Sequence, residues 1–322
     1  MQNARVYRKG TLEAEGFDPD RISDYLEEAD TTVWLDLCDP TDDELALIGE
    51  EFGLHDLALE DVKSGRQRAK LETYGHYAFI TLYAIDLESP TAELASVEVS
   101  AFASSRFFIT VRPASFDMAS VVNNLDSAAV RSTSGTAYLL HGLLDFVVDG
   151  YFDAVEVLDR GIESLEDVLF DGSSLSTTVQ KDSFAMRKAL VGLRRSVLPM
   201  REVVNALLRR ECGIVDDAMA PYYQDVYDHV LRATEWTDSL RDLVSNILET
   251  NLTIQGNRLN EIMKKLTSWA AIIAVPTAVT GFYGQNVPYP GFGDKNGFWF
   301  SIGLMVVIST GLFVGFKKRN WL

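Results

Sequence analysis

A short polar stretch, Tyr283-Gly284-Gln285-Asn286, lies between the two most apolar segments of the chain. Glycine and the two amides present neutral oxygens and N–H groups, so the stretch can contact a polar solute without a charge of its own. Prolines and glycines follow as far as Gly297. What this stretch does therefore depends on the segments that flank it.

A stripe of small and polar residues leads up to this stretch. Alternating steps of three and four residues reach Asn260, Met263, Thr267, Ala270, Ala274, Thr277, Gly281 and Gly284, and of these only Met263 is neither small nor polar. Such a 3.5-residue period is typical of helices packed side by side. Because small residues also mark helix contacts within membranes, the stripe predicts either a packing face or the lining of a narrow pore.

Two segments near the C-terminus are free of charge. Leu266–Tyr283 has 18 residues without a charged side chain, and Phe298–Phe316 has 19. A helix needs about 20 residues to cross the hydrocarbon core of a bilayer. We therefore expect two transmembrane helices, with the polar stretch in the loop between them.

Basic residues flank the spans on one side. Lys264 and Lys265 precede the first span, and Lys317, Lys318 and Arg319 follow the second. By the positive-inside rule, both ends of the chain are expected in the cytoplasm and the loop outside. The expected location is the inner (plasma) membrane, and one copy with two spans is too small to enclose a pore.

The N-terminal part shows the pattern of an α/β domain. Thr31–Leu37 and His76–Ile85 alternate like strands, and Glu98–Arg112 predicts two more strands joined near Ser104. A helix with an acidic first turn is expected between the first two strands, ending at Gly53.

Long helices follow. Thr136–Phe170 is apolar at helical spacing and acidic in its second half, whereas the next helix, from Lys181 to Arg210, is basic, so we expect a charge-matched antiparallel hairpin. Between Tyr222 and Gln255 there is no Gly or Pro, so a helix that begins near Pro221 is expected to run on into the first span.

The overall composition limits the possible functions. The chain has 322 residues, with 47 acidic and 29 basic residues and a net charge of −18, which argues against a nucleic-acid partner. The two cysteines, Cys38 and Cys212, match no metal-binding spacing, and the four histidines are scattered. Because no catalytic constellation or phosphate-binding motif is present, we expect no enzyme and no organic cofactor.

The sequence resembles the CorA family of divalent-cation channels. The stretch Tyr283–Asn286 is similar to the family's Tyr-Gly-Met-Asn between two C-terminal spans, and the terminal Lys317–Leu322 is similar to the family ending. Further similarity lies in Tyr222–Val230, in Asn260–Thr267, and in Glu60-Asp61 followed by Arg66–Glu72. Together these matches extend from about residue 55 to the end.

This resemblance implies a homopentamer in which the first span lines the pore. It implies a selectivity filter at Gly284, Gln285 and Asn286, whose neutral oxygens would hold a hydrated Mg²⁺ without stripping its water. The implied pore-lining positions, together with the stripe, are Asn260, Met263, Leu266, Thr267, Ala270, Ala274, Thr277 and Gly281. Met263 and Leu266 would form a hydrophobic gate.

The resemblance also implies a regulatory Mg²⁺ site between neighbouring subunits. Asp225 matches one family ligand well, and Asp86 matches its partner loosely. Mg²⁺ bound there would hold the channel closed, so that transport is gated by intracellular Mg²⁺.

Three departures from the family pattern leave alternatives open. Gln285 replaces the usual methionine, Pro276 falls one residue late, and the loop after Asn286 lacks an acidic cluster. The first two alternatives are a Mg²⁺ channel that also passes Co²⁺ or Ni²⁺, driven by the membrane potential, and a ZntB-like proton-coupled Zn²⁺ transporter. The third is a membrane-anchored scaffold or sensor without transport.

The expected fold class is therefore an α/β cytosolic domain with long helices and a two-helix transmembrane hairpin, in a funnel-shaped homopentamer. The expected segments are an α/β domain (1–130), a long-helix hairpin (131–215), a stalk helix continuing into the first span (216–283), an external loop (284–297), the second span (298–316) and a basic cytosolic tail (317–322). The expected partners are divalent cations, further copies of the chain and the lipid bilayer.

Overall fold

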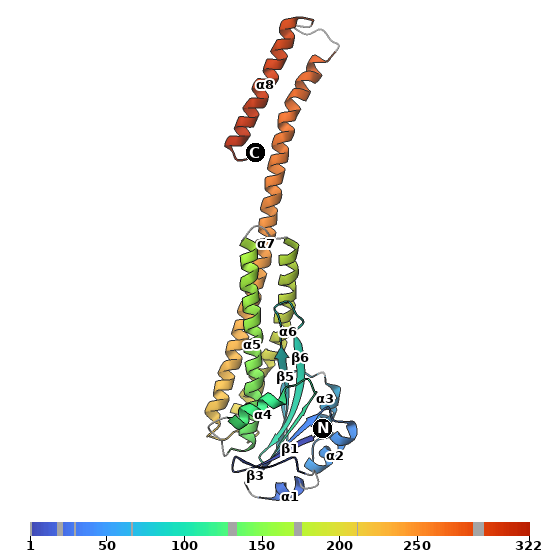
Figure 1. Cartoon of the computed structure of the whole chain (residues 1–322), viewed down its shortest axis with the longest axis vertical. Coiled ribbons are helices and arrows are strands. Elements are labelled where there is room, and N and C mark those ends of the chain that lie inside the picture. Colours follow the sequence, from blue (N-terminus) through green and yellow to red (C-terminus); the bar gives the residue numbers. More distant parts are fainter. Residues whose placement is uncertain are drawn as a thin grey trace. The chain divides into compact units, whose positions relative to one another are not determined.

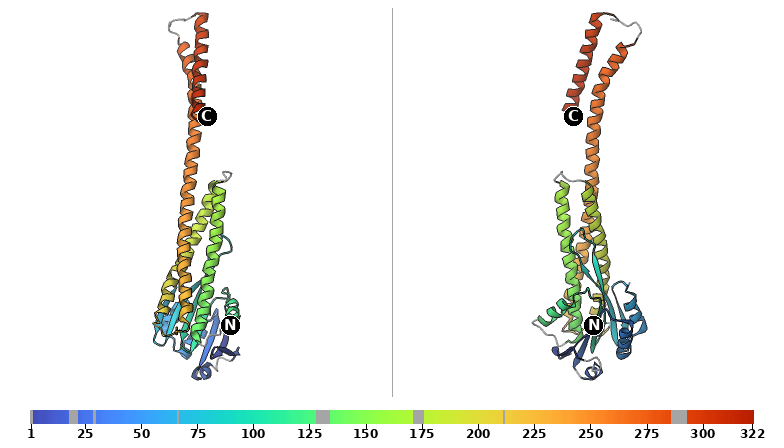
Figure 2. Two further views of the ribbon diagram at one scale, coloured as in Figure 1. Left: turned by 90° about the vertical axis from the view of Figure 1, so that its left-hand side faces the viewer. Right: turned by 45° about the vertical axis from the view of Figure 1, so that its right-hand side comes forward.

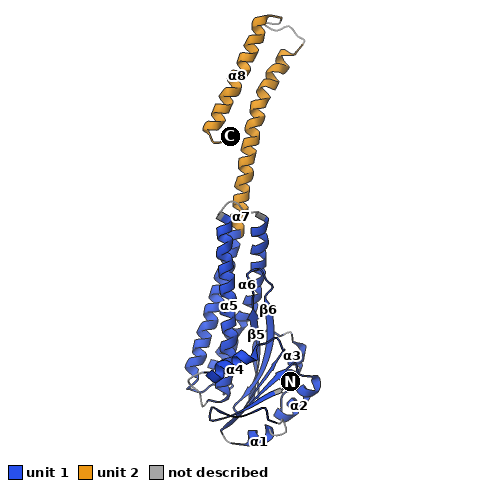
Figure 3. Cartoon of the chain, in the orientation of Figure 1, with its two compact units in different colours: residues 1–247 blue, residues 248–322 orange. Residues whose placement is uncertain are grey.

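The computed structural model describes residues 2–17, 22–28, 30–65, 67–127, 134–170, 176–210, 212–285 and 293–322 (Figure 1). The chain divides into two compact units, residues 1–247 and 248–322 (Figure 3). Helix α7 (Ala220–Tyr283) contributes to both units. Each unit is described separately below.

Unit 1 contains a seven-stranded sheet in the order β2-β1-β3-β7-β6-β5-β4. The strands are β1 (Gln2–Arg8), β2 (Thr11–Glu15), β3 (Thr31–Cys38), β4 (Lys70–Tyr74), β5 (Tyr77–Asp86), β6 (Ala95–Ser104) and β7 (Phe107–Arg112). All neighbouring strands run antiparallel except β3 and β7, which are parallel.

Strand β3 shows why both faces of this sheet are covered. Its burial is nearly continuous from Thr31 to Leu37, which is the pattern of a strand with helices on both sides. Val33, Leu35 and Leu37 belong to the core on one face. On the other face, Trp34 donates to the Thr110 hydroxyl at 3.2 Å.

Three short helices cover the first face: α1 (Ile22–Glu27), α2 (Asp42–Phe52) and α3 (Asp56–Ser64). Thr41 and Glu44 form a capping box at the start of α2, and Gly53 ends it in the left-handed conformation, as expected for a helix with these terminal residues. Buried residues of all three helices join the core cluster of the sheet.

Longer helices cover the second face (Figure 2). They are α4 (Met118–Ser127), α5 (Thr136–Phe170), α6 (Ser176–Leu208) and the first part of α7. The buried residues of α7 within unit 1 are Tyr223, Val226, Val230, Ala233, Thr237, Leu240, Val244 and Ile247. Their alternating spacing of three and four is that of a coiled-coil seam, so one continuous stripe packs this part of α7 into the helical layer.

The sequence predicted ion pairs between α5 and α6, but the ion pairs observed in this layer join other partners. The ion pairs that α6 makes within the described residues lead to other elements: Lys188 contacts Glu93 before β6 at 3.0 Å, and Arg194 contacts Asp238 of α7 at 2.8 Å. Arg160 of α5 pairs with Glu156 of its own helix. Apolar packing between α5 and α6, rather than opposite charge, therefore holds this hairpin together.

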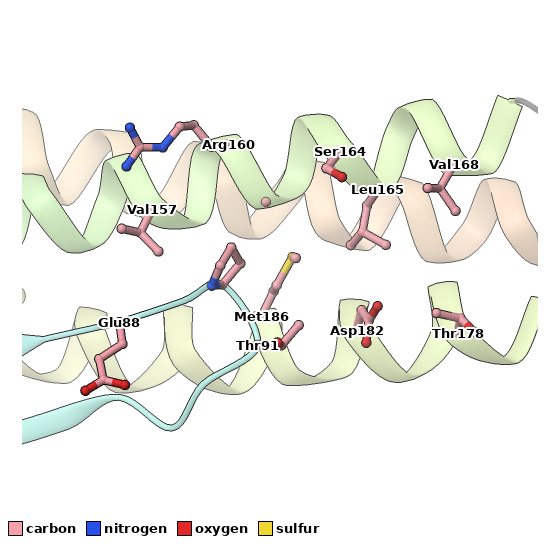
Figure 4. A pocket seen from close by; sticks show the side chains of 12 residues that line it. Glu88, Thr91, Val157, Arg160, Ser164, Leu165, Val168, Thr178, Asp182 and Met186 are labelled. Atoms are coloured by element: carbon pink, nitrogen blue, oxygen red, sulfur yellow. The ribbon is translucent and has the colours of Figure 1, made fainter.

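The loop between β5 and β6 lies against α5 and α6 (Figure 4). A Cβ atom at Gly161 would come within 2.3 Å of Pro90, so only glycine permits this approach. A cavity of about 510 Å³ lies beside the contact and is lined by residues such as Glu88, Arg160 and Asp182. None of the predicted site residues lines this cavity.

Unit 2 consists of the remaining part of α7 and of α8 (Lys295–Lys318). The two helices contact each other through Trp269 and Phe313, whose ring centroids lie 6.4 Å apart. The expected spans are thus helical, and the expected continuous helix before the first span is α7, which has 64 residues.

Candidate functional site

The predicted stripe lies on one exposed side of α7. Its members Asn260, Met263, Leu266, Thr267, Ala270, Ala274, Thr277 and Gly281 are all exposed within the chain. Met263 and Leu266 are 56% and 61% exposed despite their apolar side chains. Apart from the neighbouring backbone of α7 itself, no described atom lies within 4 Å of a Cβ built at Gly281.

The opposite side of the same helix packs against α8. The less exposed residues of the span are Ser268, Ala271, Ile272, Val275, Pro276, Val279 and Tyr283, and Ser268 is fully buried. At about 100° per residue, this side and the stripe are centred about 160° apart on α7. Packing among the described residues of one chain therefore does not use the stripe.

The stripe also carries polar oxygens. The Thr277 hydroxyl donates to the Ile273 carbonyl at 3.0 Å, so its oxygen keeps acceptor capacity on the stripe side. Asn260 adds an amide at the other end. This side of α7 can therefore accept hydrogen bonds from the water of a hydrated cation while presenting no charge to the ion.

The polar stretch begins at the C-terminus of α7. Gly284 donates to the Thr280 carbonyl at 2.8 Å, and Gln285 donates to the Phe282 carbonyl at 3.3 Å. Helix C-termini carry unsatisfied carbonyls and a partial negative charge, which favours a nearby cation. Gly284 and Gln285 are exposed, whereas the predicted Asn286 lies outside the described residues.

Position 284 requires glycine because its Cα lies close to the backbone of the last turn of α7. A Cβ there would lie 2.9 Å from the Thr280 carbonyl oxygen. That oxygen belongs to the backbone, so a larger residue would displace the last turn of α7 rather than a mobile side chain.

The two predicted regulatory residues lie on different elements of unit 1. Asp225 is on α7 with its side chain 67% exposed, and Asp86 is the exposed last residue of β5. Among the described residues no group of three or more His, Cys, Asp or Glu side chains could hold a metal ion. A site built on these two carboxylates therefore needs oxygens from water or from another copy.

Sequence reasoning missed the titratable groups that surround Asp225. His229 Nε2 lies 3.9 Å from the Asp225 carboxylate. Burial lowers the pKa of His141, against the opposing influence of Asp145 and Asp225. Burial also raises the pKa of Asp149, and Asp145 adds to that rise. Their helical spacing on α5 (141, 145, 149) was the available signal.

Asp61, Gln67, Lys70 and Glu72, which belong to the two matching motifs near residues 60–72, form a structural network. Asp61 accepts from Lys70 at 2.6 Å and from Gln67 at 2.9 Å, and Lys70 also contacts Glu72 at 2.9 Å. Burial lowers the pKa of Lys70, but these two carboxylates raise it overall. The network ties α3 to β4.

The predicted basic residues lie next to the ends of the spans. Lys264 and Lys265 are on α7, Lys317 and Lys318 are in the last turn of α8, and Arg319 is its C-cap. All five are exposed within the chain.

Two described helices, α7 and α8, are long and apolar enough to cross a membrane. Only 6% of the apolar window in each is buried, so neither is the core helix of a soluble domain. An α/β body with long helices and a C-terminal hairpin of two apolar helices defines a membrane protein with a large extramembrane part.

Comparison with known proteins identifies the family to which this membrane protein belongs. Residues 29–318 match the family described as CorA-like Mg²⁺ transporter protein. The chain is 32% identical over 300 residues to the cobalt/magnesium transport protein CorA of Thermotoga maritima, covering 92% of this chain and 85% of that protein. The chain therefore belongs to the CorA family, whose members are divalent-cation transporters and not enzymes.

Solved structures show the same fold. The CorA magnesium transporter of Methanocaldococcus jannaschii superposes with a TM-score of 0.81 at 23% identity, over 100% of this chain and 99% of that one. The cytoplasmic domain of ZntB from Vibrio parahaemolyticus RIMD 2210633 superposes with a TM-score of 0.58 at 14% identity, over 80% of this chain and 98% of that one. The α/β fold is thus shared with both proteins.

Proposed function

We propose that five copies of this chain form a channel that imports Mg²⁺, and also Co²⁺ or Ni²⁺, through the inner membrane. The observation that carries the proposal is the exposed stripe on α7, which lies opposite the side that packs on α8. In a ring of copies, this side of α7 faces the central axis while α8 lies outside. Both chain ends are cytoplasmic, in keeping with the basic residues at 264–265 and 317–319.

Gly284, Gln285 and Asn286 form the outer filter of this channel. Their neutral oxygens, together with the negative ends of the α7 helices, hold a hydrated cation without replacing its water shell. The membrane potential drives entry, at about 4.6 kcal/mol per 100 mV for a divalent ion. Met263 and Leu266 close the path by dewetting when the stripes approach one another.

Intracellular Mg²⁺ regulates the channel through Asp225 and Asp86. Both are exposed carboxylates, the oxygen ligands that Mg²⁺ prefers. A hydrated Mg²⁺ between Asp225 of one copy and Asp86 of its neighbour neutralises two acidic surfaces and holds the ring closed. Loss of the ion restores the repulsion and releases α7.

Ion uptake into proteoliposomes tests this proposal. Uptake of Mg²⁺ and of Zn²⁺ is measured in parallel, each with and without an inward proton gradient, with the filter variant Asn286→Ala as control. Mg²⁺ uptake driven by voltage alone and lost in Asn286→Ala is the expected result.

The other outcomes separate the alternatives. Zn²⁺ uptake that requires the proton gradient would instead indicate a transporter of the ZntB type. The fold shared with the cytoplasmic domain of ZntB is the observation that keeps this second candidate. Flux of neither ion contradicts transport and leaves a membrane-anchored scaffold.

A further inference from the structure

Five cations at the ends of the spans have no carboxylate partner. They are Lys264, Lys265, Lys317, Lys318 and Arg319, and all are exposed. Within the part of the chain that the structure describes, none of them forms an ion pair, although Glu261 lies one turn from both lysines of α7. In a chain with 47 acidic residues, these five described cations are therefore available to an anion.

The five cations lie at one end of the helical hairpin. Trp269 of α7 contacts Phe313 of α8. Lys265 precedes Trp269 by one turn and Lys317 follows Phe313 by one turn, so in this antiparallel pair both extend to the same side of the contact. Trp321 then folds back onto Phe316, with ring centroids 5.7 Å apart, which keeps the tail beside the end of α8.

The cations do not point along the pore-facing stripe. At about 100° per residue, Lys264 and Lys265 lie about 100° and 160° from the centre of the stripe. They flank the side of α7 that packs on α8, where the tail of α8 adds its three cations. The partner is therefore expected at the outside of the hairpin, next to lipid, and not in the ion path.

Charge is also distributed unequally between the two units. Residues 248–322 contain seven Lys and Arg against three Asp and Glu, a net charge of +4. Residues 1–247 contain 22 against 44, a net charge of −22. The basic residues are thus concentrated where the chain meets the membrane.

We propose that these five cations bind the phosphate groups of anionic phospholipids in the inner leaflet; this rests on the proposed orientation of the chain, but not on transport itself. Lys and Arg near helix ends extend their charges to the headgroup layer, and juxtamembrane basic clusters attract anionic lipids. Trp321 supplies the amphipathic ring that is typical of this layer.

Fluorescence quenching by brominated lipid tests the proposal on the full chain. The protein is reconstituted into phosphatidylcholine vesicles in which the brominated lipid is either phosphatidylglycerol or phosphatidylcholine. Trp269 and Trp321 lie next to the cations in sequence and report on lipid at the site. Wild type is expected to prefer phosphatidylglycerol. The measured preference is the ratio of quenching by brominated phosphatidylglycerol to quenching by brominated phosphatidylcholine. In the variant Lys317→Gln/Lys318→Gln/Arg319→Gln this ratio is expected to fall by about fivefold or more, and in Lys264→Gln/Lys265→Gln it is expected to fall by a smaller amount.

Lys295→Gln is the matched control, because it removes a cation from the opposite end of α8 and should leave the preference unchanged. Equal quenching by the two lipids in wild type, or an unchanged preference in the triple variant, overturns the proposal. Displacement of the lipid by millimolar inorganic phosphate overturns it as well, because the anion is then a soluble one.

Mg²⁺ uptake in the same vesicles separates this inference from the proposed function. Flux without a lipid preference contradicts the lipid site alone. A lipid preference that depends on the five cations, in vesicles without flux, supports the lipid site and contradicts the channel.

Discussion

Individual residues explain several of the motifs that the chain shares with its family. Asn320 has a φ of 54°, and Trp321 donates to the Phe316 carbonyl at 3.0 Å while Asn320 donates to the Lys317 carbonyl at 3.2 Å. These two bonds form a Schellman motif, in which asparagine tolerates the left-handed position and an apolar contact joins the residues on either side. The terminal Lys317–Leu322 therefore ends α8 and orients its three cations.

Glu98 provides a pH-dependent prediction at the residue scale. Burial raises the pKa of Glu98, against the hydrogen bond from the Tyr83 hydroxyl at 2.7 Å. The folded state therefore holds this proton more tightly than the unfolded state, so this group adds stability as the pH falls from 7 towards the raised pKa. Glu98→Gln removes the cost of the buried charge and is expected to be more stable than wild type at pH 7, by less than about 1 kcal/mol.

Thermal unfolding of the detergent-solubilised protein between pH 7 and pH 4.5 measures this effect. The advantage of Glu98→Gln should shrink as the pH falls, and Glu50→Gln, at an exposed position of α2, serves as control. An advantage that grows towards acid pH would contradict the assignment.

At the scale of elements, glycines set how closely the β5–β6 loop approaches the long helices. Gly161 of α5 faces Pro90, and Gly192 of α6 faces Leu94, where a Cβ would come within 2.9 Å of the leucine side chain. The proline ring is rigid whereas the leucine end is mobile, so the two glycines differ in what they tolerate. The Lys188–Glu93 ion pair lies in the same contact.

Two glycine substitutions with opposite expected signs test this packing. Gly161→Ala is expected to lower the free energy of unfolding, because overpacking against Pro90 costs about 1–3 kcal/mol and outweighs the better helix propensity of alanine. Gly256→Ala, in α7, where the new Cβ meets no described atom within 4 Å other than the adjoining backbone of its own helix, should raise it by about 1 kcal/mol. Calorimetry of both variants measures the two changes, and a stabilised Gly161→Ala would show that the loop moves away freely.

At the scale of the whole molecule, the central question is which side of α7 faces the ion. The stripe and the α8-facing side are both present in every copy, so a cysteine on each gives a direct comparison. In a background with Cys38→Ser and Cys212→Ser, Thr277→Cys places a thiol on the stripe and Val279→Cys places one on the side less exposed in the chain.

Cd²⁺ binds thiolates strongly and is expected to block Mg²⁺ uptake through Thr277→Cys by about tenfold or more, since five thiols would surround a narrow path in the proposed pentamer. Val279→Cys should remain near the activity of the cysteine-free background. Equal block of both variants, or block of Val279→Cys alone, would place the ion path elsewhere.

The proposed regulation by Mg²⁺ depends on the proposed assembly, since Asp225 and Asp86 have no further ligands in a described cluster of their own chain. Asp225→Asn removes one carboxylate and should raise the internal Mg²⁺ concentration that halves uptake by about tenfold. Asp242→Asn, an exposed carboxylate further along α7, is the control. An unchanged midpoint in Asp225→Asn would rule out this residue as a regulatory ligand.

Local sequence patterns were sufficient to predict the long helices, including the two that are apolar enough to cross a membrane. Charge-free runs and helical periodicity are properties of consecutive residues, which is why α5, α6, α7 and α8 were predicted correctly. The edge strands β2 and β4 were not predicted, because Thr11–Glu15 and Lys70–Tyr74 have no buried stripe of their own and depend on hydrogen bonds to their neighbours.

The sequence by itself determined the class of protein, the two long apolar helices near the C-terminus and the positions of the stripe, because each depends on residue type and spacing along one helix. Only the tertiary structure decided that the stripe lies opposite α8, that Lys188 and Arg194 pair outside the helical hairpin, and that Asp36 binds Arg112 across 76 residues at 2.9 Å. The physical reason is that the spacing of residues along one helix defines which of them share a side of that helix. Which element packs against that side depends on contacts and charges of elements far apart in the chain.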